Sequence, residues 1–143
     1  MSDSRRSARE TIEEFYQLID AAELERAIEM FSEDAVVRFG DQPDLVGRDL
    51  IAERISGLNT MAKSWTHEFF ETYEVDGPGE DRTVIIEGIV KYEMLHSGNV
   101  IPHRTVMIDI VDPSGKITVQ RNVGDLSRVF ADHQGHAPGG PEH

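Results

Sequence analysis

The sequence predicts an α+β domain. Two helices come first, a third helix follows the first strand, and a run of antiparallel strands completes the chain. Residues 12–31 place apolar side chains at helical spacing, in two stretches that break near Ala21 and Ala22. From Ser64 onward apolar and polar residues alternate, which is typical of strands. A tight turn at residues 112–115 joins the last two strands. Because the helices gather in the first part of the chain and the strands in the last part, we expect the helices to pack on one face of a sheet.

Two helices are expected at the start of the chain. The first carries its apolar stripe on Ile12, Phe15, Tyr16 and Ile19. The second repeats the spacing on Leu24, Ala27, Ile28 and Phe31.

The remaining elements follow from turn formers and from alternation. A short strand over 35–39 ends at residues 40–44, which are rich in turn formers, and a third helix follows Gly47. We expect its buried side to carry Leu50 or Ile51, Ile55 and Leu58. Strands over 65–75 and 83–94 come next. The predicted order of elements is α-α-β-α-β-β-β-β.

Residues 99–129 are expected to contain the closing hairpin. The Asp-Pro-Ser-Gly sequence at 112–115 suits a turn, because Pro fixes φ and Gly is free in φ. Alternation predicts one apolar face made of Val106, Ile108, Ile110, Ile117, Val119 and Val123. The other face carries His103, Thr105, Met107, Asp109, Thr118, Gln120 and Asn122. If Ile110 faces Ile117, then Thr105 lies opposite Asn122 and Met107 lies opposite Gln120.

The polar face of this hairpin has two interpretations. It can meet water, as one side of many antiparallel sheets does. It can also line a cavity, in which a few placed polar groups sit among apolar ones such as Met107. The local pattern does not decide between them.

Composition narrows the class of protein. The chain has 143 residues, enough for one domain with a core, and a formal net charge of −13 that repels nucleic acid and anionic lipid. It has no Cys, which excludes disulfides, a thiolate nucleophile and Cys-ligated zinc. No apolar run is long enough to span a membrane, and the first residues lack the apolar segment of a signal peptide. We expect a cytoplasmic protein.

The domain itself is expected over residues 9–131. Residues 1–8 are polar and predicted to be flexible, and residues 132–143 are rich in Gly, Pro and His and predicted to be disordered. Three histidines in this tail could bind a metal, but nothing fixes their spacing: His133, His136 and His143. We therefore expect no metal site.

The common motifs for metals, phosphates and nucleophiles are absent, so candidate site residues come from position alone. Asp41 reads most simply as a turn residue, although a carboxylate at a cavity mouth can act as a base. His67 and His103 are better candidates than His96, which lies in a predicted loop, yet a strand histidine is more often a bystander. Asp109, close to the turn, is expected to be exposed.

Three segments together resemble a known superfamily. These are the Phe-Ser-Glu-Asp-Ala-Val-Val sequence at 31–37, the Leu-Val-Gly-Arg sequence at 45–48 and the closing hairpin. Over about residues 9–130 the chain resembles the nuclear transport factor 2-like fold, in its SnoaL-like and ketosteroid isomerase-like branch. Residues 103–107 and 114–117 are most similar to small cyclases and epoxide hydrolases of polyketide antibiotic pathways. The resemblance implies a curved sheet wrapped by three helices into a cone that holds an apolar ligand.

The chain departs from the acid-base residues that this resemblance implies. Ketosteroid isomerase activity would need a Tyr on the first helix, an Asp ending the first strand and a protonated Asp on the hairpin. Here those positions carry Phe15, Phe39 and Met107, the last of them aligned on Gly115 and Lys116. The Asp of limonene-type epoxide hydrolases aligns with Asn122, which cannot take up a proton. These departures argue against proton transfer and against hydrolysis.

The resulting hypothesis is a polyketide cyclase that folds a linear apolar polyene for ring closure of the cycloaddition kind, without a dedicated acid-base pair or cofactor. Asn122, His103 and Gln120 would polarise a substrate carbonyl. The expected pocket walls are Phe15, Tyr16, Phe39, Trp65, His67, Tyr92, Met94, Thr105 and Met107. Alternatives are an epoxide hydrolase or ether-forming cyclase that uses Asp41, and a protein that binds a small apolar molecule without chemistry. The apolar outer face of the sheet would pair two copies of the chain.

Overall fold

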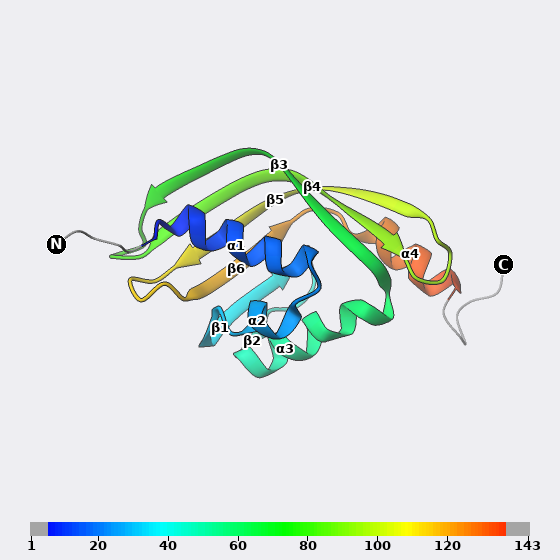
Figure 1. Cartoon of the computed structure of the whole chain (residues 1–143), viewed down its shortest axis with the longest axis horizontal. Helices are drawn as coiled ribbons and strands as arrows, with labels where there is room; N and C mark the ends of the chain where they lie inside the picture. The colour runs from blue at the N-terminus through cyan, green and yellow to red at the C-terminus, as the bar shows by residue number, and fades with distance from the viewer. Residues whose placement is uncertain (1–5, 137–143) are drawn as a thin grey trace.

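The computed structural model describes residues 6–136, in which helices lie under an open, curved, six-stranded sheet (Figure 1). The helices are α1 (Ala8–Asp20), α2 (Leu24–Ile28), α3 (Arg48–Ser56) and α4 (Ser127–His136), with a short 3₁₀ helix η1 (Gly57–Thr60). The strands are β1 (Phe31–Phe39), β2 (Leu45–Val46), β3 (Ala62–Asp76), β4 (Arg82–Met94), β5 (Val100–Val111) and β6 (Ile117–Val123). The predicted α+β class and the cone of a curved sheet over three N-terminal helices are confirmed.

The strand order across the sheet is β2-β1-β6-β5-β4-β3. Strands β3 to β6 form an antiparallel meander, as predicted. Strand β1 pairs in parallel with β6, so the sheet is mixed, whereas a wholly antiparallel sheet was expected. This pairing joins the first strand along the chain to the last one and places Phe39 beside Asn122.

The hairpin β5–β6 differs from its predicted register by two residues. Asn122 lies opposite Met107, and Gln120 lies opposite Asp109. The shift arises at the turn, where Asp112 and Lys116 close a longer loop and the register slips between Ile110 and Val111. A shift of two residues keeps every β5 side chain on its predicted face but changes its partner.

One face of this hairpin is turned into the cone. The inward β5 and β6 side chains that were expected to line a cavity are all at most 8% exposed: His103, Thr105, Met107, Gln120 and Asn122. Ile117, which was predicted on the outer face, is fully buried instead, because the irregular register at the turn reverses its side. Asp109 is also fully buried, so the expectation that it is exposed was wrong.

The curvature of the sheet depends on irregular pairing between β3 and β4. The register slips between Phe69 and Glu71, and Gly88 lies opposite Phe69. A Cβ atom on Gly88 would lie 2.4 Å from the backbone oxygen of Glu68, so only glycine permits this approach. The bend lets the long strands wrap over α1 (Figure 1).

Helix α1 covers the inside of the sheet. It begins with a capping box, in which the Ser7 hydroxyl accepts from the backbone N–H of Glu10 and the Glu10 carboxylate accepts from that of Ser7. Residues 7 and 8 are therefore ordered, although residues 1–8 were predicted to be flexible; residues 1–5 lie outside the described range. Phe15 anchors the helix by packing edge-on against Phe31.

Helix α4 was not predicted, because the Gly- and His-rich sequence after residue 131 reads as disordered. Leu126, just before this helix, and Val129, within it, form a second small core with Met94 and Ile101. Residues 132–136 belong to this helix, and the rest of the predicted tail lies outside the described residues. None of the helices in residues 6–136 combines the length and apolar character needed to cross a membrane.

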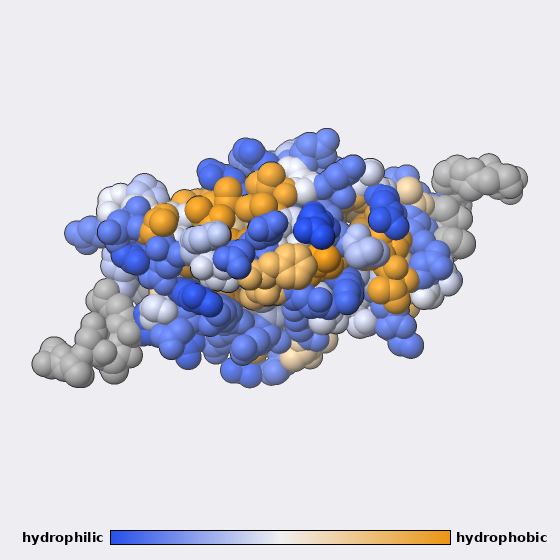
Figure 2. All heavy atoms as spheres, turned by 90° about the horizontal axis from the view of Figure 1, so that it is seen from above, coloured by the Kyte–Doolittle hydropathy of each residue, from blue (hydrophilic) through white to orange (hydrophobic). Residues whose placement is uncertain are grey.

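The outer face of the sheet remains uncovered and is rich in apolar side chains. Figure 2 views this side of the molecule and shows apolar residues gathered among charged ones. Tyr73, Ile85 and Ile108 form a row across β3, β4 and β5. Tyr73 is 54% exposed, and Arg104 lies over the exposed ring of Phe70.

Candidate active site

The space under the sheet consists of an inner cavity and a wider outer chamber. The inner cavity has a volume of only about 50 Å³, whereas the chamber at the open end of the cone reaches about 490 Å³. Phe39, Leu58 and Tyr92 line both spaces, so the chamber leads toward the inner cavity. The chamber has the size of many small-molecule sites.

Most of the predicted site residues lie together around the inner cavity. It is lined by Phe15, Tyr16, Phe39, Trp65, His67, Tyr92, Met107, Gln120 and Asn122. These side chains come from α1 and from five strands, which explains why no local motif marks the site. Four other predicted residues do not line it: His103, Thr105, Met94 and Asp41.

His103 and Thr105 stand behind Asn122. The Thr105 hydroxyl donates to Asn122 Oδ1, and His103 Nε2 lies 3.2 Å from the same oxygen. Because these two side chains contact the amide oxygen of Asn122, its NH₂ group can donate to an acceptor in the inner cavity. Gly124 allows this arrangement, because a Cβ atom there would lie 2.6 Å from the His103 ring. Met94 instead packs in the second core with α4.

His67 and Asp20 form a hydrogen-bonded pair at the inner cavity. His67 Nδ1 lies 2.5 Å from Asp20 Oδ1, and the backbone N–H of His67 donates to Asp20 Oδ2 at 3.0 Å. The ring also packs against Tyr16, with centroids 4.7 Å apart. Because Asp20 holds Nδ1 and fixes the ring, Nε2 is the nitrogen available for proton transfer. The sequence pattern does not single out Asp20, which is the last residue of α1 and lies 47 positions from His67.

A buried carboxyl, that of Asp109, lies behind Tyr16. The Tyr16 hydroxyl is 3.2 Å from Asp109 Oδ2, and Gln120 faces Asp109 across the hairpin. Burial raises the pKa of Asp109 to about 7, although the side chains of Gln120 and Tyr16 act to lower it. Burial and the neighbouring Asp109 also raise the pKa of Tyr16 well above its usual value. Tyr16 therefore stays a neutral hydrogen-bond donor.

The protonation state of Asp109 decides where the Tyr16 hydroxyl points. An ionised Asp109 can only accept, so the hydroxyl donates to it. A protonated Asp109 can donate to Tyr16, and the Tyr16 hydrogen is then free for an acceptor in the inner cavity. Gln120 Nε2 is buried and makes no hydrogen bond of good geometry with the described residues, although its side chain lowers the pKa of Asp109.

The remaining candidates lie elsewhere. Asp41 is exposed and borders a groove beside Arg38 and Arg121, away from the inner cavity. His133, on α4, lies at the outer chamber, where its ring is 6.0 Å from that of His96. Residues 6–136 contain no group of three or more side chains suited to hold a metal ion.

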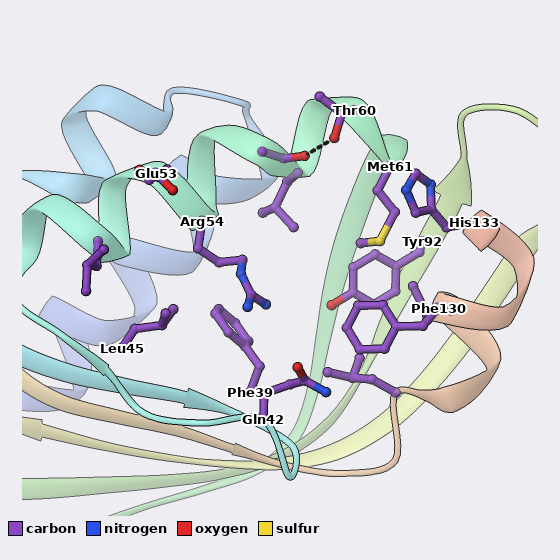
Figure 3. A pocket seen from close by; sticks show the side chains of 15 residues that line it. Phe39, Gln42, Leu45, Glu53, Arg54, Thr60, Met61, Tyr92, Phe130 and His133 are labelled. Atoms are coloured by element: carbon purple, nitrogen blue, oxygen red, sulfur yellow. Dashed lines mark hydrogen bonds between the residues drawn. The ribbon is translucent and has the colours of Figure 1, made fainter. Parts of the chain in front are cut away.

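The outer chamber is bounded by α3, η1 and α4 (Figure 3). Phe39, Met61, Tyr92 and Phe130 make its walls largely apolar. Tyr92 contributes a hydroxyl, and burial raises the pKa of Tyr92 to about 12, which keeps that group neutral. Among the described lining residues, Arg54 is the only arginine or lysine.

Comparisons with solved structures agree on the fold. A candidate scytalone dehydratase from Novosphingobium aromaticivorans superposes with a TM-score of 0.73 at 16% identity, over 82% of this chain and 80% of the other. SalBIII, an epoxide hydrolase/cyclase-like enzyme of pyran ring formation in the polyether salinomycin, gives 0.72 at 17% identity, over 84% and 92%. A candidate polyketide cyclase from Xanthomonas campestris gives 0.64 at 14% identity, over 87% and 94%.

At these identities the solved structures establish the fold and not the reaction. No curated protein sequence is significantly similar to the chain. The model of the SnoaL-like domain family matches residues 1–99, which include the α1 and β3 residues of the Asp20–His67 pair. Because this match covers more than half of the sequence, the chain belongs to the SnoaL-like domain family, within the nuclear transport factor 2-like fold.

Proposed function

We propose that the protein is a cyclase of polyketide tailoring, as in antibiotic biosynthesis, and that it closes a ring by proton transfer inside the cone. The observation that carries this proposal is the His67–Asp20 pair at an inner cavity whose walls are largely apolar. An imidazole oriented by a carboxylate is a common general base, and it would supply the acid-base function that the sequence pattern does not predict. The chemistry named for SalBIII and for the Xanthomonas protein is consistent with this class of reaction.

The proposed reaction begins at a carbon next to a carbonyl group of the substrate. His67 Nε2 takes a proton from that carbon, and the resulting imidazolium is stabilised by Asp20. The negative charge moves to the carbonyl oxygen, where donors of Tyr16, Gln120 or Asn122 can stabilise it. The carbon attacks a second carbonyl of the same molecule, breaking its π bond. His67 then returns the proton to the new alkoxide, so the product is an isomer of the substrate.

Ring closure by cycloaddition is the second candidate. It is supported by the inner walls of Phe15, Phe39, Trp65 and Met107, which could hold a flexible chain in a reactive shape without acid or base. Hydrolysis through Asp41 has less support, because that carboxylate is exposed and does not line the inner cavity.

Proton abstraction can be tested before the natural substrate is known. In D₂O, α-tetralone exchanges the protons beside its carbonyl slowly, and NMR follows the exchange. We expect the protein to accelerate it, His67→Gln to lose at least about 100-fold of the acceleration, and Asp20→Asn to lose about tenfold. His96→Gln removes an exposed loop histidine and is the matched control.

A second measurement separates the reaction classes. The protein is incubated with the linear poly-β-ketone of a polyketide synthase, and the product mass is recorded. A product of unchanged mass that requires His67 supports the proposal. Equal turnover by His67→Gln would instead indicate cycloaddition, a gain of water would indicate hydrolysis, and an unchanged ligand would indicate a binding protein.

A further inference from the structure

The outer chamber contains an arginine that lacks a counter-ion. Arg54 lies in the last turn of α3 and makes no ion pair with any of the described residues, whereas Arg38 and Arg82 each pair with a carboxylate. The chain has 27 acidic and 14 basic residues, so acidic partners are abundant. A half-buried cation without an anionic partner is a group poised to receive an anion.

The Arg54 side chain is held in place by an aromatic ring. Its guanidinium carbon lies 5.6 Å from the centroid of Phe39, within the range of a cation–π contact. Figure 3 shows the guanidinium directed toward Phe39 and the middle of the chamber, with the Glu53 carboxylate up against the helix and away from it. The favourable position of a cation at a helix C-terminus explains an arginine in this turn but not its inward direction.

Other polar groups of the same chamber are also without partners. Tyr92 has a neutral hydroxyl with no hydrogen bond to the described residues, and His133 has a buried Nδ1 without one. Both lie at the chamber with Arg54, across from it in Figure 3. Figure 3 shows the Tyr92 hydroxyl directed toward the middle of the chamber, so this neutral donor and the always charged guanidinium of Arg54 could each bond one oxygen of a carboxylate.

We infer that the outer chamber binds the carboxylate of an apolar carboxylic acid, with Arg54 as its counter-ion. The inference rests on the proposed function, because it names the class of substrate that this site would take. Phe39, which stacks on Arg54, also lines the inner cavity. A substrate anchored at Arg54 could therefore extend its apolar body past Phe39 and Tyr92 toward His67.

Two probes of the same shape test this inference by calorimetry. At neutral pH we expect 2-naphthoate to bind at least about tenfold more tightly than the neutral 2-naphthamide. Arg54→Gln should remove this preference and leave the affinity for the amide nearly unchanged. Arg26→Gln, at an exposed ion pair with Glu23, changes the net charge equally and should keep the preference. Thermal unfolding of both variants checks that each remains folded.

The outcomes separate this inference from the proposed function. Equal affinity for the two probes, a preference that survives in Arg54→Gln, or no binding of either probe would each overturn the carboxylate site. None of these results depends on proton exchange by His67. Conversely, a naphthoate preference that requires Arg54 would stand even if α-tetralone exchange showed no catalysis.

Discussion

The carboxyl of Asp109 is fully buried, and the group that it opposes across the hairpin is the neutral amide of Gln120. Burial raises the pKa of Asp109 from 3.8 to about 7, so the folded state favours the protonated form. A raised pKa in the folded state gives a stabilisation that is complete below the unfolded pKa and lost as pH rises through the folded pKa. Because of this residue, the free energy of unfolding should fall as the pH rises from about 4 to about 7.

We expect Asp109→Asn to remove that pH dependence. At pH 5 the variant should be about as stable as the parent protein, because both side chains are then neutral. At pH 8 the variant should be more stable, by up to about 4 kcal/mol for a shift of this size. Thermal unfolding of both proteins from pH 4 to pH 9 measures the difference, and parallel curves would contradict the assignment.

The sequence predicts those residues of the inner cavity that belong to the regular spacing of a strand or a helix. Alternation on β5 and β6 identifies Met107, Gln120 and Asn122, and helical spacing identifies Phe15 and Tyr16. Polar partners were harder, because they depend on distances between elements. Asp20 ends a helix and reads as a solvated residue until β3 brings His67 to it.

At the level of elements, the hairpin shows what the sequence pattern can determine. Alternation determines which β5 side chains share a face, but the length of the turn determines which residues face each other. The loop closed by Asp112 and Lys116 moves Gln120 from Met107 to Asp109. The buried Tyr16–Asp109–Gln120 arrangement therefore became visible only with the register.

The bend between β3 and β4 supports a second prediction. Gly88→Ala would place a Cβ atom 2.4 Å from the backbone oxygen of Glu68, so one of the two strands must move. We expect a loss of roughly 1–3 kcal/mol in the free energy of unfolding, measured by denaturant titration.

Gly57→Ala is the control for this change. Gly57 has a φ of −71°, and a Cβ atom there would meet nothing within 4 Å. The same substitution should leave stability within about 1 kcal/mol of the parent, or raise it slightly by restricting the unfolded chain. Equal effects at the two glycines would show that the close approach at Gly88 does not hold the bend.

For the whole molecule, the fold class and most element positions follow from periodicity alone. Periodicity does not predict how the first strand and the C-terminal helix pack against the rest of the fold. Strand β1 pairs in parallel with β6, and Val129 of α4, together with the preceding Leu126, packs against Met94 of β4 and Ile101 of β5. Both depend on contacts between distant segments, and the Gly- and His-rich composition after residue 131 masks the helix.

The outer face of the sheet carries exposed apolar side chains that suit assembly of the protein with a second copy. Phe70, Tyr73, Val75 and Val123 are each at least 45% exposed on this face or its rim, and Ile108 lies near its middle. Exposed apolar side chains that gather on one face often mark a contact with a partner. Because one copy offers the same surface as another, we expect two copies to pair through it about a twofold axis.

Sedimentation velocity at micromolar concentrations should then report a dimer. Ile108→Glu should shift the protein to a monomer, since it would bury a charge in the centre of the contact. Leu95→Glu introduces the same charge at a residue that is 44% exposed in the β4–β5 turn, and it should leave the dimer intact. A monomeric parent protein, or a dimer that persists in Ile108→Glu, would exclude this face as the contact. Because the active-site cavity opens on the opposite side of the sheet, the monomeric variant should retain exchange of α-tetralone protons.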